Sequence, residues 1–289
     1  SFKTYGGGAI IHADQANFLF IQNSVFVHNY AEQDGAVLYI TDSAVRIVNT
    51  HINGNRAGKN GGAIYAVGGT ISVEGTTIES NIANEFGGGL YSTHASLSLS
   101  ASAILNNTAA YGGGIYIEGG IAGAQHVLFK NNRANKGHGG GYCIRNATET
   151  IGFNDVVLVN NFAEGYGGGG YSFNSTMALI TSLISHNRGR NGGGLCFVLS
   201  KDCILRQTNV TKNVALNKTA KQSTTDFAGV ASRAVDGNTD GAYANGSQTH
   251  TSMQNNPFWE VDLGQEYPID DVILWNRTEN DGAYVSRMD

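Results

Sequence analysis

The sequence predicts an all-β protein whose first part is a parallel β-solenoid, and three observations support this prediction. A motif of one apolar residue, two variable residues, Asn, one variable residue and then Ala or Gly occurs eight times. Glycine-rich stretches such as GGAIY follow most copies, and β-branched runs such as GTISVEG and DVVLV lie between them. Helical repeats are excluded, because two helices cannot be drawn through so much Gly, Thr, Ser and Asn. The sequence therefore favours a coil of short strands for each repeat.

The asparagine of this motif fixes the period of the repeat. Successive copies are separated by 25 to 29 residues, and most of them by 26. A fixed period in this range indicates stacked units that share one continuous core. The sequence therefore predicts a solenoid of about eight rungs over residues 1–212. The motif asparagines are Asn29, Asn55, Asn81, Asn107, Asn132, Asn161, Asn187 and Asn213.

Each position of the motif has an expected role in such a coil. The apolar residue three places before the Asn is expected to fill the interior, and the small residue two places after it to lie where the wall turns inward. The Asn is expected to adopt the left-handed conformation of a sharp bend and to bond its amide to the Asn one rung away. The glycines that follow are expected to supply positive φ angles or close backbone approach at a second corner.

The walls of the solenoid offer little sign of catalysis in the sequence. Acidic residues are sparse, and those at the corner after the motif are expected to be solvated charges: Glu32, Glu85 and Glu164. The glycine runs are not followed by Lys-Ser or Lys-Thr, which argues against a phosphate-binding loop. Four tyrosines at the repeat spacing are expected to form a stacked ladder, either as wall packing or as a sugar-binding strip. These are Tyr39, Tyr65, Tyr91 and Tyr116.

The pairing of FVHN or FKNN with GGAIY or GGGLY resembles a known repeat. It is similar to the repeats of the polymorphic outer-membrane proteins, whose signatures are FxxN and GGA followed by an aliphatic residue. The resemblance covers residues 5 to about 212 and extends more generally to right-handed parallel β-helix proteins. It implies a secreted or surface-displayed solenoid, often adhesive, and it does not imply an enzyme.

Composition changes near residue 213, where the repeat stops. Both prolines and both tryptophans of the chain lie beyond this point. The segments FWEVDLG and IDDVILWN alternate in the manner of strands, which predicts a second β module over residues 213–289. Its sequence resembles the discoidin, or F5/8 type C, family and, within that family, the F-type fucose-binding lectins. The resemblance implies a β-sandwich jelly roll of which residues 213–289 would form the N-terminal part, in truncated form.

The F-type lectin signature places a His and an Arg around a gap of 26 residues, and the gap between His250 and Arg277 has that length. By resemblance, these side chains would hold the ring and hydroxyl oxygens of fucose, since planar donors suit sugar hydroxyls. Arg287 would be the second arginine, and Tyr284 would supply the apolar wall. Glu279 stands where the family usually has Asp, and Tyr284 stands where it has a basic residue.

The same resemblance implies a structural calcium site in the segment RAVDGNTDGAYANGS. Its ligands would be the carbonyl of Arg233 together with Asp236, Asn238 and Ser247, a set of oxygens that suits a hard cation. A plain Asx-turn loop without metal is the alternative. Calcium would fix the loop that presents His250.

Composition and charge restrict which partners the protein is expected to bind and where in or outside the cell it is expected to act. A net charge of −5 without a basic cluster along the sequence argues against a nucleic-acid partner. No apolar run approaches the roughly 18 residues of a membrane span. The chain begins at Ser1 without a signal peptide, and it is interpreted as a fragment of an extracellular or cell-surface protein.

These patterns favour a carbohydrate-binding adhesion protein, specific for glycans that include fucosylated ones, with a β-helix stalk. Two alternatives stay open. One is a structural or adhesive solenoid with an inert discoidin module. The other is a polysaccharide lyase or hydrolase with a carbohydrate-binding appendage, which would need acidic or basic groups gathered on one outer wall.

Overall fold

A computed structural model of the chain describes residues 3–4, 10–200, 203–206, 209–210, 215, 217–236 and 248–265. The chain divides into two compact units, Ser1–Thr211 and Lys212–Asp289, and each is described by itself. The regular structure of the described residues consists of strands and one short 3-10 helix, so the predicted all-β class is confirmed.

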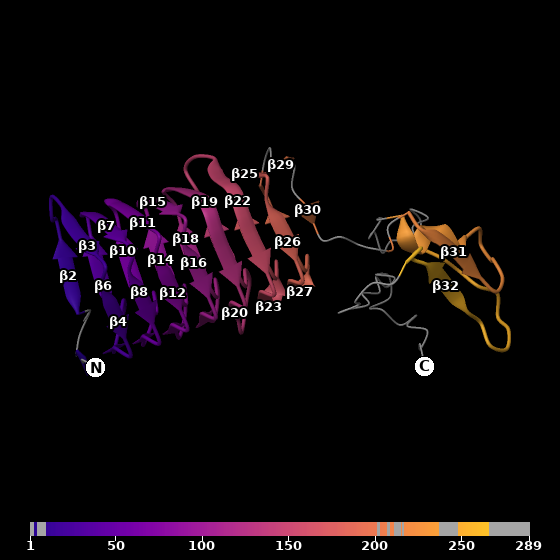
Figure 1. The fold of residues 1–289 in the computed structure, drawn as a ribbon, viewed down its shortest axis with the longest axis horizontal. Helices are drawn as coiled ribbons and strands as arrows, with labels where there is room; N and C mark the ends of the chain where they lie inside the picture. The colour runs from indigo at the N-terminus through magenta and orange to yellow at the C-terminus, as the bar shows by residue number, and fades with distance from the viewer. Residues whose placement is uncertain are drawn as a thin grey trace. The chain divides into compact units, whose positions relative to one another are not determined.

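The first unit is a parallel β-helix built from three sheets, called A, B and C below (Figure 1). The chain passes from sheet A to sheet B to sheet C in each turn, and strands from successive turns pair in parallel. Sheet A contains β1 (Lys3–Thr4), β5 (Tyr30–Ala31), β9 (Arg56–Ala57), β13 (Ile82–Ala83), β17 (Thr108–Ala109), β20 (Arg133–Ala134), β23 (Phe162–Tyr166) and β27 (Arg188–Asn191). Sheet B contains β2 (Ile11–Asp14), β6 (Leu38–Thr41), β10 (Ile64–Val67), β14 (Leu90–Thr93), β18 (Ile115–Glu118), β21 (Tyr142–Arg145), β24 (Gly170–Phe173) and β28 (Leu195–Val198).

Sheet C is the largest of the three, because most turns contribute two short strands to it. Its first row contains β3 (Leu19–Gln22), β7 (Ala44–Val48), β11 (Thr70–Glu74), β15 (Ser96–Ser100), β25 (Met177–Ile180) and β29 (Ile204–Arg206). Its second row contains β4 (Val25–Val27), β8 (His51–Asn53), β12 (Thr77–Glu79), β16 (Ala103–Leu105), β26 (Leu183–Ser185) and β30 (Asn209–Val210). Two long strands, β19 (Ile121–Lys130) and β22 (Ile151–Val159), belong to both rows.

The interior of the coil is apolar and continuous from turn to turn. The motif residues Ile52, Ile78 and Ile104 pair in register and are fully buried, which confirms the interior role expected of this position. Burying side chains of this size stabilises the fold by roughly 1.5–3 kcal/mol each. Because neighbouring turns share this core, no single turn could bury its own apolar face.

The motif asparagines form a buried ladder of side-chain amides, as expected. The backbone N–H and the Nδ2 of Asn55 both donate to the Oδ1 of Asn81, each at 2.9 Å. The same Nδ2 also donates to the carbonyl of Phe26 at 3.1 Å. This pattern repeats from Asn29 to Asn187, and every ladder amide but the last is less than 6 % exposed. The ladder therefore satisfies backbone groups that the bend would otherwise leave buried and unpaired.

The expectation that the ladder Asn itself adopts the left-handed conformation is wrong. The positive φ lies one residue earlier in each turn, for example at Asn106 (53°), ahead of Asn107. The preceding residue is exposed or part-exposed, so its identity is free among types that tolerate this conformation. The ladder Asn is selected instead by its amide, which supplies both an acceptor and two donors.

The second corner requires glycine for two reasons, both of which were expected. Gly61 has a φ of 60°, a conformation that side chains disfavour. At the next position, a Cβ on Gly62 would meet the backbone of Ile82 and Gly88 in the neighbouring turn. The corner glycines therefore allow backbone from successive turns to stack closely.

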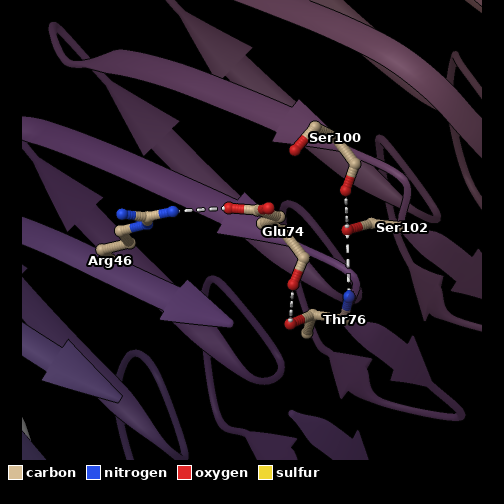
Figure 2. Close-up of polar contacts among 5 residues, drawn as sticks. All are labelled: Arg46, Glu74, Thr76, Ser100 and Ser102. Carbon is tan, nitrogen blue, oxygen red and sulfur yellow. Dashed lines mark hydrogen bonds and ion pairs between the residues drawn. The ribbon is translucent and has the colours of Figure 1, made fainter. Parts of the chain in front are cut away.

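A second ladder, of hydroxyl groups, lies five residues before most of the ladder asparagines and was not predicted. The Oγ1 of Thr76 accepts the backbone N–H of Thr50 at 3.2 Å and donates to the carbonyl of Glu74 at 2.9 Å. Ser102 does the same for Thr76 and Ser100, as Figure 2 shows beside an outer ion pair of 2.8 Å between Arg46 and Glu74. The hydroxyl thus links successive turns by hydrogen bonds at the kink between the two rows of sheet C.

The two long strands of sheet C occur where this hydroxyl is missing. Valine occupies the position in two turns, at Val127 and Val156. There β19 and β22 run through without a break, with the left-handed residues His126 and Asp155 just before the valines. The left-handed bend is therefore present in these turns as well, and they differ in that the valine itself pairs in the ladder of the sheet.

The second unit is described over residues 215, 217–236 and 248–265. Strand β31 (Thr219–Gln222) pairs antiparallel with β32 (Trp259–Asp262), and the 3-10 helix η1 (Ala231–Val235) lies between them in sequence. The Trp259 indole donates to the carbonyl of Ala231 at 3.0 Å, which fixes η1 against β32. Antiparallel pairing of this kind is what a β-sandwich requires.

Candidate functional site

His250 is the predicted sugar-binding residue that lies among the described residues, and hydrogen bonds hold its backbone. Its N–H donates to the carbonyl of Gly229 at 2.8 Å. Its carbonyl accepts the N–H of Asp226 at 3.0 Å and the Nε2 of Gln222 at 3.1 Å. Gln222 ends β31, so the sheet of the second unit anchors the segment that carries His250.

The His250 ring has a defined environment with one polar atom unused. It packs edge-on against Phe227, with ring centroids 5.1 Å apart and planes at 78°. Phe227 is 67 % exposed, so an apolar ring stands at the surface beside the imidazole. The Nδ1 of His250 and the Nε2 of Gln248 are buried, and neither atom has a hydrogen-bond partner among the described residues. A polar ligand could use such unpaired groups.

Gly229 allows the close approach of the two segments. A Cβ at this position would lie 2.6 Å from the backbone nitrogen of His250 and 2.7 Å from its Cβ. Gly229 is buried, and its carbonyl also accepts the Gln222 side chain at 2.9 Å. Sequence reasoning missed Gly229 and Gln222, since single residues without a repeat give no signal.

The other predicted sugar-binding residues, Arg277, Tyr284 and Arg287, lie outside the described residues. The arrangement of these three around His250 stays a prediction. The same holds for Asn238 and Ser247 of the expected calcium set, which also fall outside the described ranges.

Arg233 and Asp236, the remaining members of that set, lie at the carboxyl end of η1. Asp236 caps this helix and follows Arg233 by three residues, so both belong to a single 3-10 turn. The carbonyl end of a helix is electronegative, and it offers oxygens to a cation beside the carboxylate. The two described members of the expected set therefore lie at one end of η1, and calcium binding by the full set stays a prediction. Among the described residues, no group of three or more His, Cys, Asp and Glu side chains could hold a metal ion.

The tyrosine ladder lies on the outer side of sheet B and is stacked as expected. The rings of Tyr65 and Tyr91 are 5.1 Å apart and nearly parallel, and Tyr39 and Tyr116 continue the stack on either side. Burial, followed by the charge of Asp34, raises the pKa of Tyr65 to about 12. Because neighbouring rings cover each other's faces, a sugar ring has no open face to stack on. The geometry favours wall packing over a sugar-binding strip.

The corner acids are not gathered on the solenoid wall. Glu85 and Glu164 are exposed and Glu32 is half-buried, in turns that are not adjacent. Among the helices of the described residues, none is long and apolar enough to cross a membrane.

Two family models match parts of the chain. Residues 49–67 match the Chlamydia polymorphic membrane protein repeat, which fits the expected likeness of the solenoid. Residues 233–288 match the NedA-like, galactose-binding domain of the F5/8 type C class. Both resemblances drawn from the sequence are thus confirmed: polymorphic-membrane-protein-like repeats precede an F5/8 type C-like segment.

Curated relatives point the same way for part of the chain. Fucolectin-6 of Anguilla japonica is 42% identical over 82 residues, which are 27% of this chain and 44% of that protein. Fucolectin of Anguilla anguilla is 48% identical over 56 residues, covering 19% and 35% of the two chains. Fucolectin-3 of Anguilla japonica is 43% identical over 82 residues, covering 27% and 45%. The chain thus spans less than half the length of these relatives. No solved structure matches the chain.

Proposed function

We propose that the second unit binds carbohydrate and that L-fucose is a ligand. The observation that carries the proposal is the placement of His250. Its backbone is held by hydrogen bonds, an exposed Phe227 ring stands beside it, and its buried Nδ1 has no partner among the described residues. The likeness to fucolectins and to a galactose-binding domain supports the same class of ligand.

The proposed site combines planar donors with an apolar wall. His250 and Arg277 donate to ring and hydroxyl oxygens of the sugar, and Arg287 adds a second guanidinium. Tyr284 covers the apolar face of the sugar, including the methyl group that distinguishes fucose. A neutral sugar suits this set, because its hydroxyls accept from guanidinium and imidazole without needing a compensating charge.

We further propose a structural calcium ion held by the carbonyl of Arg233 and by Asp236, Asn238 and Ser247. When bound, the ion neutralises the carboxylate and fixes the segment between η1 and His250. The described part of this set is consistent with that role, because both members lie at one helix end.

The biological setting proposed is extracellular or at the cell surface. The solenoid would act as a stalk that presents the sugar site for adhesion to glycans, including fucosylated ones. The likeness of the repeats to those of polymorphic membrane proteins supports this setting.

Retention of the whole protein on immobilised L-fucose tests the proposal, with calcium and with a chelator. The wild type is expected to be retained only with calcium, and His250→Ala is expected to abolish retention. His51→Ala is the matched control, because His51 lies in β8 of the solenoid and is part-exposed. Circular dichroism should show the same strand content for all three proteins.

Two outcomes would overturn parts of the proposal. Failure of the folded, calcium-loaded wild type to bind would exclude fucose as the ligand. Retention that persists in the chelator would exclude a role for calcium while leaving sugar binding in place.

A further inference from the structure

Sheet A carries a hollow of about 590 Å³ that no part of the proposed lectin function uses. Its wall is formed by the corner after β20, by strand β23 and by strand β27, which belong to three successive turns. Volumes of this order suit small ligands. The hollow belongs wholly to the first unit.

The hollow arises from unequal corner lengths. The first left-handed glycine comes seven residues after Asn132, six after Asn161 and five after Asn187. A register shift between β23 and β27 follows, with Glu164 and Gly165 on β23 opposite the single residue Arg190 on β27. The hollow therefore lies where successive corners shorten, between the corner after β20 and strand β27.

Basic residues from separate turns meet in this place. Lys136, Arg188 and Arg190 line the hollow, and the Arg133 guanidinium lies 4.1 Å from the Phe162 ring centroid next to it. All four are exposed, and within the described part of the chain none of them is in an ion pair. Guanidinium groups stacked on a ring keep their in-plane donors available for a carboxylate or sulfate.

Aromatic and acceptor groups complete the lining. Tyr166 is 36 % exposed and stacks on His138 with centroids 4.8 Å apart. The Nδ1 of His138 accepts the Tyr166 N–H at 3.0 Å, so the proton of the neutral ring is on Nε2. Glu164 adds one carboxylate to the lining.

We propose that this hollow binds an acidic saccharide, a sugar that carries a carboxylate or sulfate group. The cations take the acidic group, and the rings of Tyr166 and Phe162 contact the apolar edge of the sugar. The carboxylate of Glu164 disfavours ligands of dense negative charge, such as acidic peptides, because it repels closely spaced anionic groups. The same carboxylate accepts hydrogen bonds from the hydroxyls of a sugar.

Calorimetric titration of the whole protein with digalacturonate and with a sulfated disaccharide tests this assignment. A neutral disaccharide, a glutamate-rich peptide and inorganic sulfate serve as comparison ligands. Binding of an acidic disaccharide is expected to weaken about tenfold or more in R188Q/R190Q, since charge-assisted hydrogen bonds are lost. Tyr166→Ala is expected to weaken it as well, and His250→Ala to leave it unchanged, which separates this site from the proposed lectin site.

Arg56→Gln is the matched control. Arg56 occupies the same position of sheet A as Arg188, at a distance of several turns, and lies outside the hollow. Equal binding by R188Q/R190Q and the wild type would overturn the assignment. It would also be overturned if no acidic saccharide bound the folded protein, or if the peptide or sulfate bound as tightly as the saccharide.

Discussion

The side-chain oxygen of Asn107 accepts two hydrogen bonds from Asn81, the residue 26 positions earlier. The Asn81 backbone nitrogen lies 2.9 Å from this oxygen, and its Nδ2 lies 3.1 Å from it. Asn107 in turn donates through its own Nδ2 to Asn132 and to the carbonyl of Ile78. One buried amide thus joins three successive turns, which explains why no other side chain occurs at this position of the repeat between Asn29 and Asn187.

Removing this amide is expected to destabilise the solenoid strongly. Asn107→Ala leaves two buried donors of Asn81 and the Ile78 carbonyl unpaired, at a cost of about 1–3 kcal/mol for each group. The free energy of unfolding, measured with urea, should therefore fall by roughly 3 kcal/mol or more. Asn106→Gly is the control, since Asn106 is exposed and left-handed; a comparable loss in that variant would contradict the ladder argument.

The hydroxyl ladder predicts that removing a single oxygen atom, that of Thr76, lowers the stability of the solenoid. Thr76→Val keeps the shape of a buried side chain but leaves the N–H of Thr50 without its acceptor. Thermal or urea unfolding should show a loss of about 1–3 kcal/mol. Thr77→Val, one residue on at a part-exposed strand position, should change stability little. Equal effects of the two variants would exclude the proposed role of the hydroxyl.

Gly88 and Gly152 provide a matched test of whether the close backbone approach at a corner requires glycine. Gly88→Ala places a Cβ against the backbone of Thr108 and Gly113, which cannot move without opening the coil. We expect a loss of at least about 1–3 kcal/mol, the usual cost of overpacking. At Gly152 in β22, an added Cβ would meet no atom within 4 Å, and the backbone conformation there is not left-handed. Gly152→Ala should therefore be neutral or slightly stabilising in the same unfolding measurement.

The pH dependence of stability has a predicted sign at His138. Burial, followed by the charge of Arg145, lowers the pKa of this imidazole below its usual 6.5. The unfolded chain then binds more protons than the folded one, so the His138 contribution is fully present above pH of about 6.5. It declines as the pH falls from there through the lowered folded pKa.

Nuclear magnetic resonance titration of the His138 ring checks this directly. The titration midpoint should lie below 6.5, and His138→Phe should reduce the loss of thermal stability between neutral and mildly acidic pH. A midpoint above the usual value would contradict the burial argument. The imidazole accepts the Tyr166 N–H, so protonation should also perturb the Tyr166 amide resonance.

Gly229 offers a test of how His250 is presented. A side chain at this position would collide with the backbone of His250 and break the hydrogen bond between them. Gly229→Ala is therefore expected to lower retention on fucose about as much as His250→Ala does. Gly152→Ala, in the solenoid, is the control; full retention by Gly229→Ala would show that this contact does not position the imidazole.

Much of the solenoid could be predicted because its chemistry repeats. A buried apolar residue, a ladder Asn and a corner glycine recur at nearly constant spacing, and one rung dictates the next. The conformation of the ladder Asn was predicted wrongly, because Asn is favoured in left-handed bends and equally as an amide donor. The hydrogen bonds of the side chain, rather than the backbone conformation, determine why Asn occupies this position.

The sequence by itself determined the all-β class, the period and the inward face, since these follow from local patterns of side chains. Only the tertiary structure decided what the outer surface can do. Lys136 lies two turns before Arg188 and Arg190 in the sequence, and the three line one hollow because successive turns stack in register. His250 and Gly229 are likewise brought together by the second unit, across a separation that no sequence pattern encodes. Contacts between turns and between distant segments depend on the folded path of the chain, and that path gives each surface its chemistry.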